Sequence, residues 1–377
     1  MAGGEVQGSR FDGVGGLRVL IAGGGTGGHV IPALAIAREL RDAHGAEVRF
    51  VGTARGLETR LVPEAGFALE LVRSGQLKNV SLATRLRTAI DLPLGALECM
   101  RLLGRFQPQV VVGVGGYASG PGMLAALLRR VPTLAFEPNA VPGLANRLVG
   151  RWVSAAAVNF EPTRRFFRNA HVTGIPVRAE FFAVGAKNAD APPRLLVFGG
   201  SQGARVFNAV MPRIAKALLE YVPGLTILHQ AGARAAEKTA EAYRAGGADP
   251  ARWQVAEFLD EMPQRFAEAD LILCRSGAST VAELAAAGRA AVLVPFPGAA
   301  DDHQRKNADV FAEAGAAQLR VQVANDESME RYLLGDLSKL LLHPQRRAEM
   351  AEHVRKLARP DAAQEIATMV VELARLG

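Results

Sequence analysis

Two glycine-rich segments in the first half of the chain have the residue types that bind phosphate groups. Residues 23–29 (GGGTGGH) and 113–121 (GVGGYASGP) each follow an apolar run and precede a helical pattern. Backbone N–H groups at such a turn, together with the positive end of the following helix, bind phosphate without hindrance from side chains. Because both turns are expected at one edge of one sheet, they predict a single large anionic ligand.

Two similar segments lie in the second half, at residues 199–204 (GGSQGA) and 276–280 (SGAST). Small hydroxyl residues and glycines at the start of a helix suit a nucleotide diphosphate. Glu283 follows one turn later and can accept hydrogen bonds from ribose hydroxyls, although an exposed helix glutamate is its default explanation. A tight turn without a ligand is the alternative for each loop taken singly. Four such loops in one chain favour ligand binding.

A dense polar cluster, residues 301–307 (DDHQRKN), follows the apolar and proline-rich run AVLVPFPG. Open α/β sheets bind ligands just beyond the carboxyl ends of their strands. Carboxylate and amide groups at this position are therefore candidates for binding sugar hydroxyls. A solvated helix start explains the aspartates, but it does not also explain His303 and Gln304.

Several other chemistries are disfavoured. The first loop satisfies GxGxxG, but a dinucleotide site also needs an acidic residue at the end of the second strand, where this chain has Gly52 and Thr53. The chain has no metal-ligand spacing such as HExxH, no DxD pair and no P-loop. These absences argue against NAD-binding, metal-centred and nucleotide triphosphatase sites.

A parallel sheet must position these loops. Short apolar runs alternate with helical patterns, which predicts βαβ units. The expected strands are residues 18–22, 47–51, 109–114, 133–136, 194–198, 225–229, 271–274 and 291–294, with helices such as 32–43 and 281–287 between them.

An internal echo indicates two domains of the same kind. RVLIAGGGTGG from Arg18 aligns without gaps with RLLVFGGSQGA from Arg194, and a length of 377 residues suits two domains with a cleft between them. Gly174 and Pro176 in TGIPVR mark the expected boundary. The final segment, after Pro360, has the pattern of an amphipathic helix.

Composition and charge limit the class of protein. With 49% apolar and 21% charged residues, the chain is expected to be globular, apart from a flexible leader over residues 1–16. No segment is apolar enough to span a bilayer, and two distant cysteines fit a reducing compartment. Residues 1–178 carry a charge of +9 and residues 179–377 a charge of −2. The basic half predicts an anionic surface or substrate, whereas nucleic acid is disfavoured because no binding motif appears.

Together these segments resemble a known family over nearly the whole chain. The matching motifs, in order, are GGTGGHVIPALAIA, GGYASGP, NAVPGLANR, TGIPVR, GGSQGAR, EFLDEM, CRSGAST and ADDHQRKNA. They resemble the bacterial N-acetylglucosaminyltransferases that convert lipid I into lipid II. The resemblance implies an α/β protein of the GT-B type, with two Rossmann-like doubly wound parallel-sheet domains facing across a cleft. The domains would be 17–177, joined by the C-terminal helix 361–377, and 178–360.

The resemblance also implies roles for individual residues. UDP-N-acetylglucosamine would bind mainly to the second domain, with Glu283 on the ribose, Phe258 and Leu259 around the uracil, and Gln304 and His303 on the sugar. The full set of implied donor-binding residues is Thr26, Gly27, Gly28, Asn139, Arg178, Ser201, Phe258, Leu259, Ser279, Thr280, Glu283, His303 and Gln304. The implied acceptor-binding residues are Gly25, Gly115, Gly116, Tyr117 and Ser119.

His29 and Glu137 are the candidate catalytic residues. His29 is the first candidate for the base because an imidazole titrates near neutrality, with a capping role as its structural alternative. Family members often have HEQN where this chain has Phe136, Glu137, Pro138 and Asn139. Because this departure removes a histidine and a glutamine, it makes His29 the stronger candidate for the catalytic base. No metal or other cofactor is expected, because Arg178 and a helix N-terminus would stabilise the leaving diphosphate.

Residues 82–106 combine seven apolar residues with four arginines in a pattern that suits an interfacial membrane helix. Core packing is the default explanation of such a stripe. The basic first half and a lipid-linked acceptor favour peripheral attachment to the anionic cytoplasmic face of the bacterial inner membrane. Other cell-wall synthesis proteins are further candidate partners. The alternatives to the lipid I enzyme are a transferase acting on diacylglycerol and a non-catalytic scaffold that binds sugar nucleotides.

Overall fold

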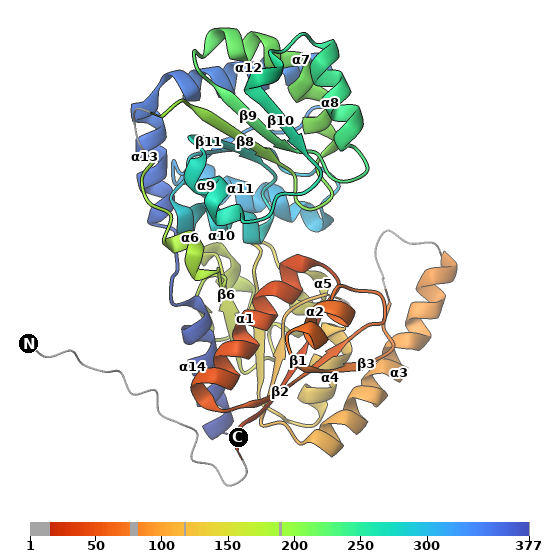
Figure 1. Ribbon diagram of the computed structural model, residues 1–377. Helices are drawn as coiled ribbons and strands as arrows, with labels where there is room; N and C mark the ends of the chain where they lie inside the picture. Colours follow the sequence, from red (N-terminus) through yellow and green to blue (C-terminus); the bar gives the residue numbers. More distant parts are fainter. Residues whose placement is uncertain (1–15, 76–81, 117, 188–190, 377) are drawn as a thin grey trace, which may run out of the picture. The chain divides into compact units, whose positions relative to one another are not determined.

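The chain is described by a computed structural model, shown in Figure 1, which covers residues 16–75, 82–116, 118–187 and 191–376, without the side chains of residues 82–90. The predicted leader therefore lies outside the described residues, except for residue 16. The chain divides into two compact units. Unit 1 comprises Met1–Pro176 and Asp361–Gly377, and unit 2 comprises Val177–Pro360.

Unit 1 is built on a parallel sheet of seven strands in the order β3-β2-β1-β4-β5-β6-β7. The strands are β1 (Arg18–Ala22), β2 (Glu47–Gly52), β3 (Ala68–Leu71), β4 (Val110–Gly113), β5 (Thr133–Glu137), β6 (Ala155–Val158) and β7 (Ala170–Val172). The helices are α1 (Gly27–His44), α2 (Glu58–Glu64), α3 (Leu82–Phe106), α4 (Ser119–Leu128), α5 (Leu144–Val149), the 3₁₀ helix η1 (Glu161–Phe166) and α14 (Ala362–Leu376).

Unit 2 repeats the plan with six parallel strands in the order β10-β9-β8-β11-β12-β13. The strands are β8 (Arg194–Phe198), β9 (Thr226–Gln230), β10 (Trp253–Ala256), β11 (Leu271–Cys274), β12 (Ala291–Leu293) and β13 (Gln318–Leu319). The helices are α6 (Ala179–Phe182), α7 (Arg205–Tyr221), α8 (Ala236–Ala245), η2 (Pro250–Arg252), α9 (Met262–Glu268), α10 (Ala278–Ala287), η3 (Ala300–Asp302), α11 (His303–Glu313), α12 (Asp326–Leu342) and α13 (Pro344–Arg355).

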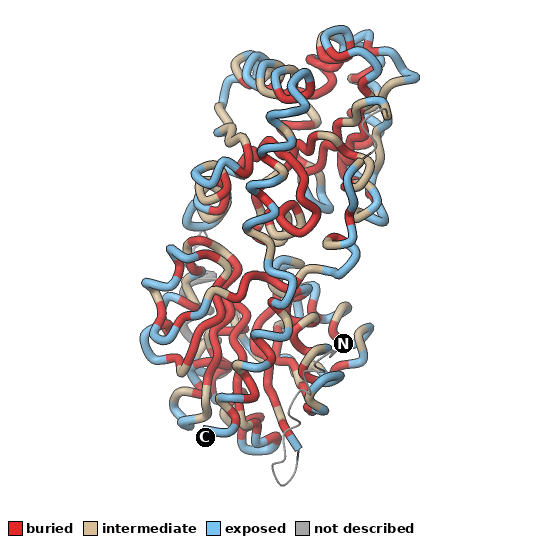
Figure 2. Tube along the Cα trace, turned by 90° about the vertical axis from the view of Figure 1, so that its left-hand side faces the viewer, coloured by how far each residue is buried: buried red, intermediate tan, exposed pale blue. Residues whose placement is uncertain are grey.

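The central strands are buried on both faces, as Figure 2 shows for the red segments of the tube. Every residue of β4, β5 and β11 is buried. Continuous runs of valine, leucine and isoleucine therefore form strands here because helices cover both sides of a parallel sheet. The predicted class, two doubly wound parallel sheets, is confirmed.

The order of strands places the glycine loops. In the sheet of unit 1, β2 and β3 lie on one side of β1. The strands β4 and β5, which come later in the chain, lie on its other side. Right-handed crossovers then put successive helices on opposite faces. The same reversal occurs between β8 and β11 in unit 2. Ligands of open α/β sheets bind at these reversal points, beyond the carboxyl ends of the strands. The four glycine loops follow β1, β4, β8 and β11, the strands on either side of each reversal.

Some predicted elements need correction. Helix α1 begins at Gly27 and contains Pro32, whereas the sequence predicted a start at Pro32. The carbonyl of Thr26 accepts hydrogen bonds from the N–H groups of His29 and Val30, so the helix starts inside the glycine loop. Helix α10 similarly begins at Ala278, before the predicted residue 281. The strands β3, β6, β7, β10 and β13 were not predicted.

The terminal helix α14 belongs to unit 1. Its buried residues, which include Ile366 and Val370, face α1, β4 and β5. Figure 1 shows α14 beside α1. The segment after Pro360 thus completes the first unit and not the second.

Candidate active site

The first glycine loop and the start of α1 carry five of the predicted site residues. Gly25 has a φ of 97°, which only glycine adopts without strain. Thr26 precedes the helix in an extended conformation, and Gly27, Gly28 and His29 form its first turn. Thr26 and Gly28 are exposed, and the other three are half-buried. The structure therefore brings these residues together at the positive end of a long helix.

The two glycine loops of unit 1 are in direct contact. The N–H of Gly24 donates to the carbonyl of Gly115 at 3.3 Å. A Cβ atom at Gly116 would collide with the carbonyl of Gly24. The ring of His29 lies against Gly115, where an added Cβ would be 2.9 Å from the imidazole Cε1. The candidate base therefore lies against the second loop.

The remaining acceptor-binding candidates are less accessible. Tyr117 lies outside the described residues. Ser119 is fully buried at the start of α4, and its hydroxyl has no hydrogen-bond partner among the described residues. It can contact a ligand only if the loop moves. The N–H of Gly25 is already taken, since it donates to the carboxylate of Glu58 at 2.7 Å. A direct bond from this N–H to acceptor phosphate is therefore not available in this conformation.

Glu137 is enclosed by the loop that follows β5. Its Oε1 accepts from the N–H of Asn139 at 3.0 Å, and its Oε2 accepts from the N–H of Gly143 at 3.1 Å and from Nδ2 of Asn146 at 3.0 Å. Burial raises the pKa of Glu137, and these donors act in the opposite direction. The carboxylate organises residues 137–146, and Asn139, which is half-buried, takes its position from it.

In unit 2, the loop after β8 presents Ser201 to solvent. Nε2 of Gln230 donates to the carbonyl of Gly200 at 3.0 Å, and this hydrogen bond fixes the loop to the end of β9. Behind it, the buried His229 contacts the hydroxyl of Tyr243 and Oδ1 of Asn208, each at 3.1 Å. Burial lowers the pKa of His229 to about 3. This histidine is therefore neutral and supports the fold of the loop.

The loop after β11 leads into α10, which carries Ser279, Thr280 and Glu283. All three are half-buried, and the Ser279 hydroxyl has no hydrogen-bond partner among the described residues. Burial raises the pKa of Glu283 to about 7, against the opposing effect of the positive charge of Arg178. Arg178 is exposed at the start of α6, and its guanidinium lies over the ring of Phe181.

Two hydrogen bonds join the polar start of α11 to the loop that follows β11. The hydroxyl of Ser276 donates to the carbonyl of Gln304 at 2.8 Å, and Nδ2 of Asn307 donates to the carbonyl of Ser276 at 3.1 Å. Oε1 of Gln304 accepts from the N–H of Phe296 at 3.0 Å. Asn307 belongs to the predicted polar cluster 301–307 but not to the implied donor-binding residues, and its buried amide is a second link between α11 and the SGAST turn.

Two consecutive residues just before α11 are strained. Asp301 and Asp302 have φ values of 52° and 54°, in the left-handed region that non-glycine residues seldom adopt. Such strain is concentrated at functional sites. His303 follows directly, and its Nδ1 contacts the carbonyl of Ala300 at 2.7 Å.

The last two donor candidates follow the edge strand β10. Phe258 is 57% exposed, whereas Leu259 is buried. Unit 2 thus contains this pair together with Arg178, Ser201, Ser279, Thr280, Glu283, His303 and Gln304, and unit 1 contains Thr26, Gly27, Gly28 and Asn139. Among the described residues, no group of three or more His, Cys, Asp or Glu side chains is placed to hold a metal ion.

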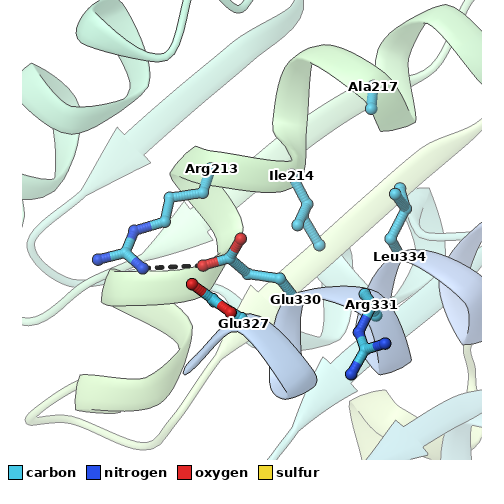
Figure 3. Close-up of a pocket in the computed structure, with 7 residues that line it drawn as sticks. All are labelled: Arg213, Ile214, Ala217, Glu327, Glu330, Arg331 and Leu334. Carbon is cyan, nitrogen blue, oxygen red and sulfur yellow. Dashed lines mark hydrogen bonds and ion pairs between the residues drawn. The ribbon is translucent and has the colours of Figure 1, made fainter. Parts of the chain in front are cut away.

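One cavity in unit 2 lies elsewhere. Figure 3 shows this hollow of about 540 Å³ between α7 and α12, and its rim is bridged by a 2.8 Å contact between Arg213 and Glu330. Its remaining lining residues are Ile214, Ala217, Glu327, Arg331 and Leu334. None of the predicted site residues lines it, so it is not the candidate active site.

The chain matches two domain models. The glycosyltransferase family 28 N-terminal domain covers residues 19–158, and the glycosyltransferase family 28 C-terminal domain covers residues 194–366. The similar solved structures include MurG of Acinetobacter baumannii, with a TM-score of 0.81 and 34% identity, covering 94% of this chain and 99% of that one. The calicheamicin glycosyltransferase CalG4, at 16% identity and a TM-score of 0.64 over 95% and 99% of the two chains, shows the fold alone.

Curated relatives are similar over nearly their full length. The UDP-N-acetylglucosamine–N-acetylmuramyl-(pentapeptide) pyrophosphoryl-undecaprenol N-acetylglucosamine transferase of Anaeromyxobacter sp. (strain K) is 44% identical over 364 residues, which are 95% of this chain and 94% of the relative. The protein of the same name from Myxococcus xanthus is 41% identical over 95% of this chain and 93% of the relative. The chain therefore belongs to glycosyltransferase family 28 and, within it, to the UDP-N-acetylglucosamine–N-acetylmuramyl-(pentapeptide) pyrophosphoryl-undecaprenol N-acetylglucosamine transferases.

Proposed function

We propose that this chain transfers N-acetylglucosamine from UDP to the C4 hydroxyl of N-acetylmuramic acid in lipid I, giving lipid II. The observation that carries the proposal is the pair of glycine loops at the strand-order reversal of each sheet, in a member of this transferase family. The names of the relatives supply the donor and the acceptor. The diacylglycerol and scaffold alternatives have no such support.

The donor binds mainly to unit 2. The exposed Ser201 and the start of α10 receive the diphosphate, because N–H groups and hydroxyls converge there at a positive helix end. The hydroxyl of Ser279, which has no hydrogen-bond partner in the described part of the chain, supports this assignment. Glu283 accepts from the ribose, and Gln304 and His303 contact the sugar.

Transfer proceeds by a single displacement with inversion. The acceptor oxygen forms a bond to the anomeric carbon as the bond from that carbon to the UDP oxygen breaks, and His29 takes the hydroxyl proton. The position of His29 in the first turn of α1, against Gly115, supports this role. The charge that develops on UDP is balanced by the N-terminus of α10 and by Arg178.

The reaction needs no metal ion, because Arg178 and α10 supply the positive charge at the leaving group. Activity is expected to persist in excess chelator when UDP release is followed. Abolition by the chelator that magnesium reverses would contradict this part of the proposal.

Attachment to an anionic membrane surface is peripheral. Among the described helices, none has the length and apolar content to span a bilayer. Three neighbouring helices of unit 1, α3, α4 and α5, carry or precede large exposed apolar side chains, and arginines flank them. The exposed apolar residues are Leu97, Leu124, Leu128, Leu148 and Trp152, the last being 69% exposed.

A membrane test compares two exposed aromatic residues. Trp152→Ala is expected to weaken co-sedimentation with anionic vesicles, and salt is expected to weaken binding of the parent protein. Tyr221→Ala, at an exposed position in unit 2, is the control. Equal binding of the parent protein and Trp152→Ala would show that the end of α5 is not part of the surface that contacts the membrane.

The function itself is tested by UDP release from UDP-N-acetylglucosamine, with and without a short-chain lipid I analogue and with UDP-glucose as the control donor. Acceptor-dependent release that is selective for N-acetylglucosamine is the expected result. His29→Ala should lower turnover far more than donor affinity. Donor binding without turnover on lipid I would reject the proposed acceptor.

A further inference from the structure

Glu58 is a buried carboxylate that the proposed mechanism does not use. It is the first residue of α2 and is 1% exposed. Its Oε2 accepts from the N–H of Gly25 at 2.7 Å, and its Oε1 accepts from the N–H and the hydroxyl of Thr53, each at 3.0 Å. A buried carboxylate is tolerated only when donors satisfy it in this way.

Three glycines lie directly against the side chain of Glu58. An added Cβ atom at Gly24 or Gly56 would collide with its carboxyl group, and one at Gly52 would lie 2.6 Å from its Cγ. The chain therefore keeps glycine at three positions around this one side chain. Such close packing fixes the carboxylate to within a narrow range of positions.

Glu58 and the preceding residue, Leu57, hold Gly25 by both of its polar backbone groups. The N–H of Gly25 donates to Glu58, and the carbonyl of Gly25 accepts from the N–H of Leu57 at 3.1 Å. Gly25 directly precedes Thr26, whose carbonyl starts α1 by accepting from the N–H of His29. The position of His29 thus depends on where Gly25 is held.

Two other roles for Glu58 fit the structure less well. An acidic residue near the end of a second strand can bind ribose in related folds, but this carboxylate is turned away from solvent. A structural role confined to α2 does not explain why its strongest contact is with a loop 33 residues away.

We propose that Glu58 is a positioning residue, which fixes the first glycine loop against the second and thereby sets the location of the His29 imidazole. The inference rests on the proposed function, because it requires His29 to act in transfer. The second loop holds the opposite side, through Gly24 and Gly115.

Glu58→Gln keeps the size of the side chain but changes its hydrogen bonding. The amide has one oxygen, so it can satisfy either Gly25 or Thr53, and its NH₂ group faces the other donor. The loop is then expected to shift on one side. Glu64→Gln, an exposed position on the same helix, is the matched control.

The kinetic test measures kcat, KM for each substrate and the Kd for UDP in unit 2. Glu58→Gln is expected to lower kcat by about 100-fold, the effect of misplacing a reacting group by about 1 Å, while the Kd for UDP stays at the parental value. Glu64→Gln should match the parent. Parental kcat in Glu58→Gln would overturn the inference, and an equal loss of UDP affinity would show a general structural effect instead.

A spectroscopic test does not depend on turnover. The chain has seven histidines, so the imidazole Cε1–Hε1 signals are few, and His29 is assigned by its absence in His29→Ala. Glu58→Gln should shift the His29 signal and leave that of the buried His229 unchanged. An unmoved His29 signal in a folded variant would reject the positioning role.

A milder variant covers the case in which Glu58→Gln fails to fold. Thr53→Val removes the hydroxyl donor but keeps the carboxylate and its bond to Gly25. It should shift the His29 signal by less than Glu58→Gln and lower kcat by less. An inactive parent protein would reject the proposed function, whereas an active parent with a fully active Thr53→Val and Glu58→Gln would reject only the role of Glu58.

Discussion

At the scale of single residues, unit 1 uses buried carboxylates to shape its loops. Glu58 and Glu137 each accept at least three hydrogen bonds from groups in loops at the carboxyl edge of the sheet. Neither carboxylate is open to solvent. These two carboxylates therefore hold the backbone of the neighbouring loops in position.

Glu137→Gln tests this interpretation for a residue that the resemblance makes a catalytic candidate. The amide would present NH₂ to donors of Asn139, Gly143 or Asn146, and the free energy of unfolding should fall by about 1–3 kcal/mol. Urea unfolding measures the change, with the exposed Glu161→Gln as the control. Lost turnover with unchanged unfolding would instead support a direct part in the chemistry.

Glu283 should make stability depend on pH. Burial raises its pKa from 4.5 to about 7 in the folded chain, so the folded protein keeps a proton that the unfolded chain releases between these values. Stability should therefore fall as the pH rises from about 4.5 to about 7, and remain lower above it.

The measurement is the difference in Tm between Glu283→Gln and the parent protein from pH 4.5 to pH 8. Since glutamine does not titrate, the variant should gain on the parent as the pH rises, and the gap should vanish near pH 4.5. A gap that does not change with pH would mean that Glu283 titrates normally.

The sequence predicted which residues cluster better than it predicted what each one contacts. The start of α11 does lie against the SGAST turn, where the backbone carbonyl of Gln304 accepts from Ser276, because strand order places the two loops at one edge of the sheet. The role of Glu58 was not predicted. Its side chain reaches the first glycine loop only in the folded chain, where it accepts from Gly25 as well as from Thr53. Long-range hydrogen bonds of this kind leave no local pattern in a sequence.

At the scale of elements, the contact between the two glycine loops is the feature most sensitive to mutation. Gly116 has a φ of 78°, and a Cβ there would collide with the carbonyl of Gly24. Gly116→Ala should thus cost about 1–3 kcal/mol of stability and lower turnover by separating the loops.

Gly120→Ala is the matched comparison. It lies one turn further on, in α4, with open space where the Cβ would go. A helical Gly→Ala change of this kind is expected to be neutral or to add about 0.4–1 kcal/mol. Urea unfolding and UDP release should separate the two variants, and equal behaviour would mean that the loops tolerate displacement.

Strands with strong apolar runs were predicted from the sequence, whereas the alanine-rich β6 and the edge strands β3, β7, β10 and β13 were not. β1, β8 and β11 match their predicted bounds because their sequences are continuous apolar runs before a glycine or polar turn. β6 has the sequence AAAV, and alanine favours helices. It is a strand because β5 and β7 pair with it on either side, a tertiary effect.

Helix α3 gives a mixed outcome for the predicted membrane stripe. Leu103 and Phe106 are buried in the core of unit 1 with Cys99, so the end of the stripe packs inward and does not face a membrane. Leu97 is exposed. The side chains of residues 82–90, which include three of the seven apolar residues of the predicted stripe, lie outside the described part of the chain.

At the scale of the whole molecule, each unit has its own sheet and its own pair of glycine loops, as the alignment of RVLIAGGGTGG with RLLVFGGSQGA predicted. The domain type and the enzyme family were evident from the sequence because several motifs occur in order. The family assignment is confirmed by the relatives at 41–44% identity.

Ile366→Ala should destabilise one unit and not the other. Ile366 is fully buried in α14 within unit 1, and truncation of such a side chain costs about 2–5 kcal/mol. Hydrogen exchange should therefore accelerate in β1 and β4 but not in β8 and β11, with UDP affinity unchanged. The exposed Thr368→Ala is the control, and equal acceleration in both sheets would contradict the assignment of α14.

The docking of α14 also fixes an order of events on the ribosome. The residues of α14 that cover α1 and β5 are made only after all of Val177–Pro360. At about 5–20 residues per second, synthesis of that segment takes about 10–40 seconds. During this time the nascent unit 1 has an uncovered apolar face, which makes it a client for chaperones that bind such surfaces, while unit 2 can fold to completion first.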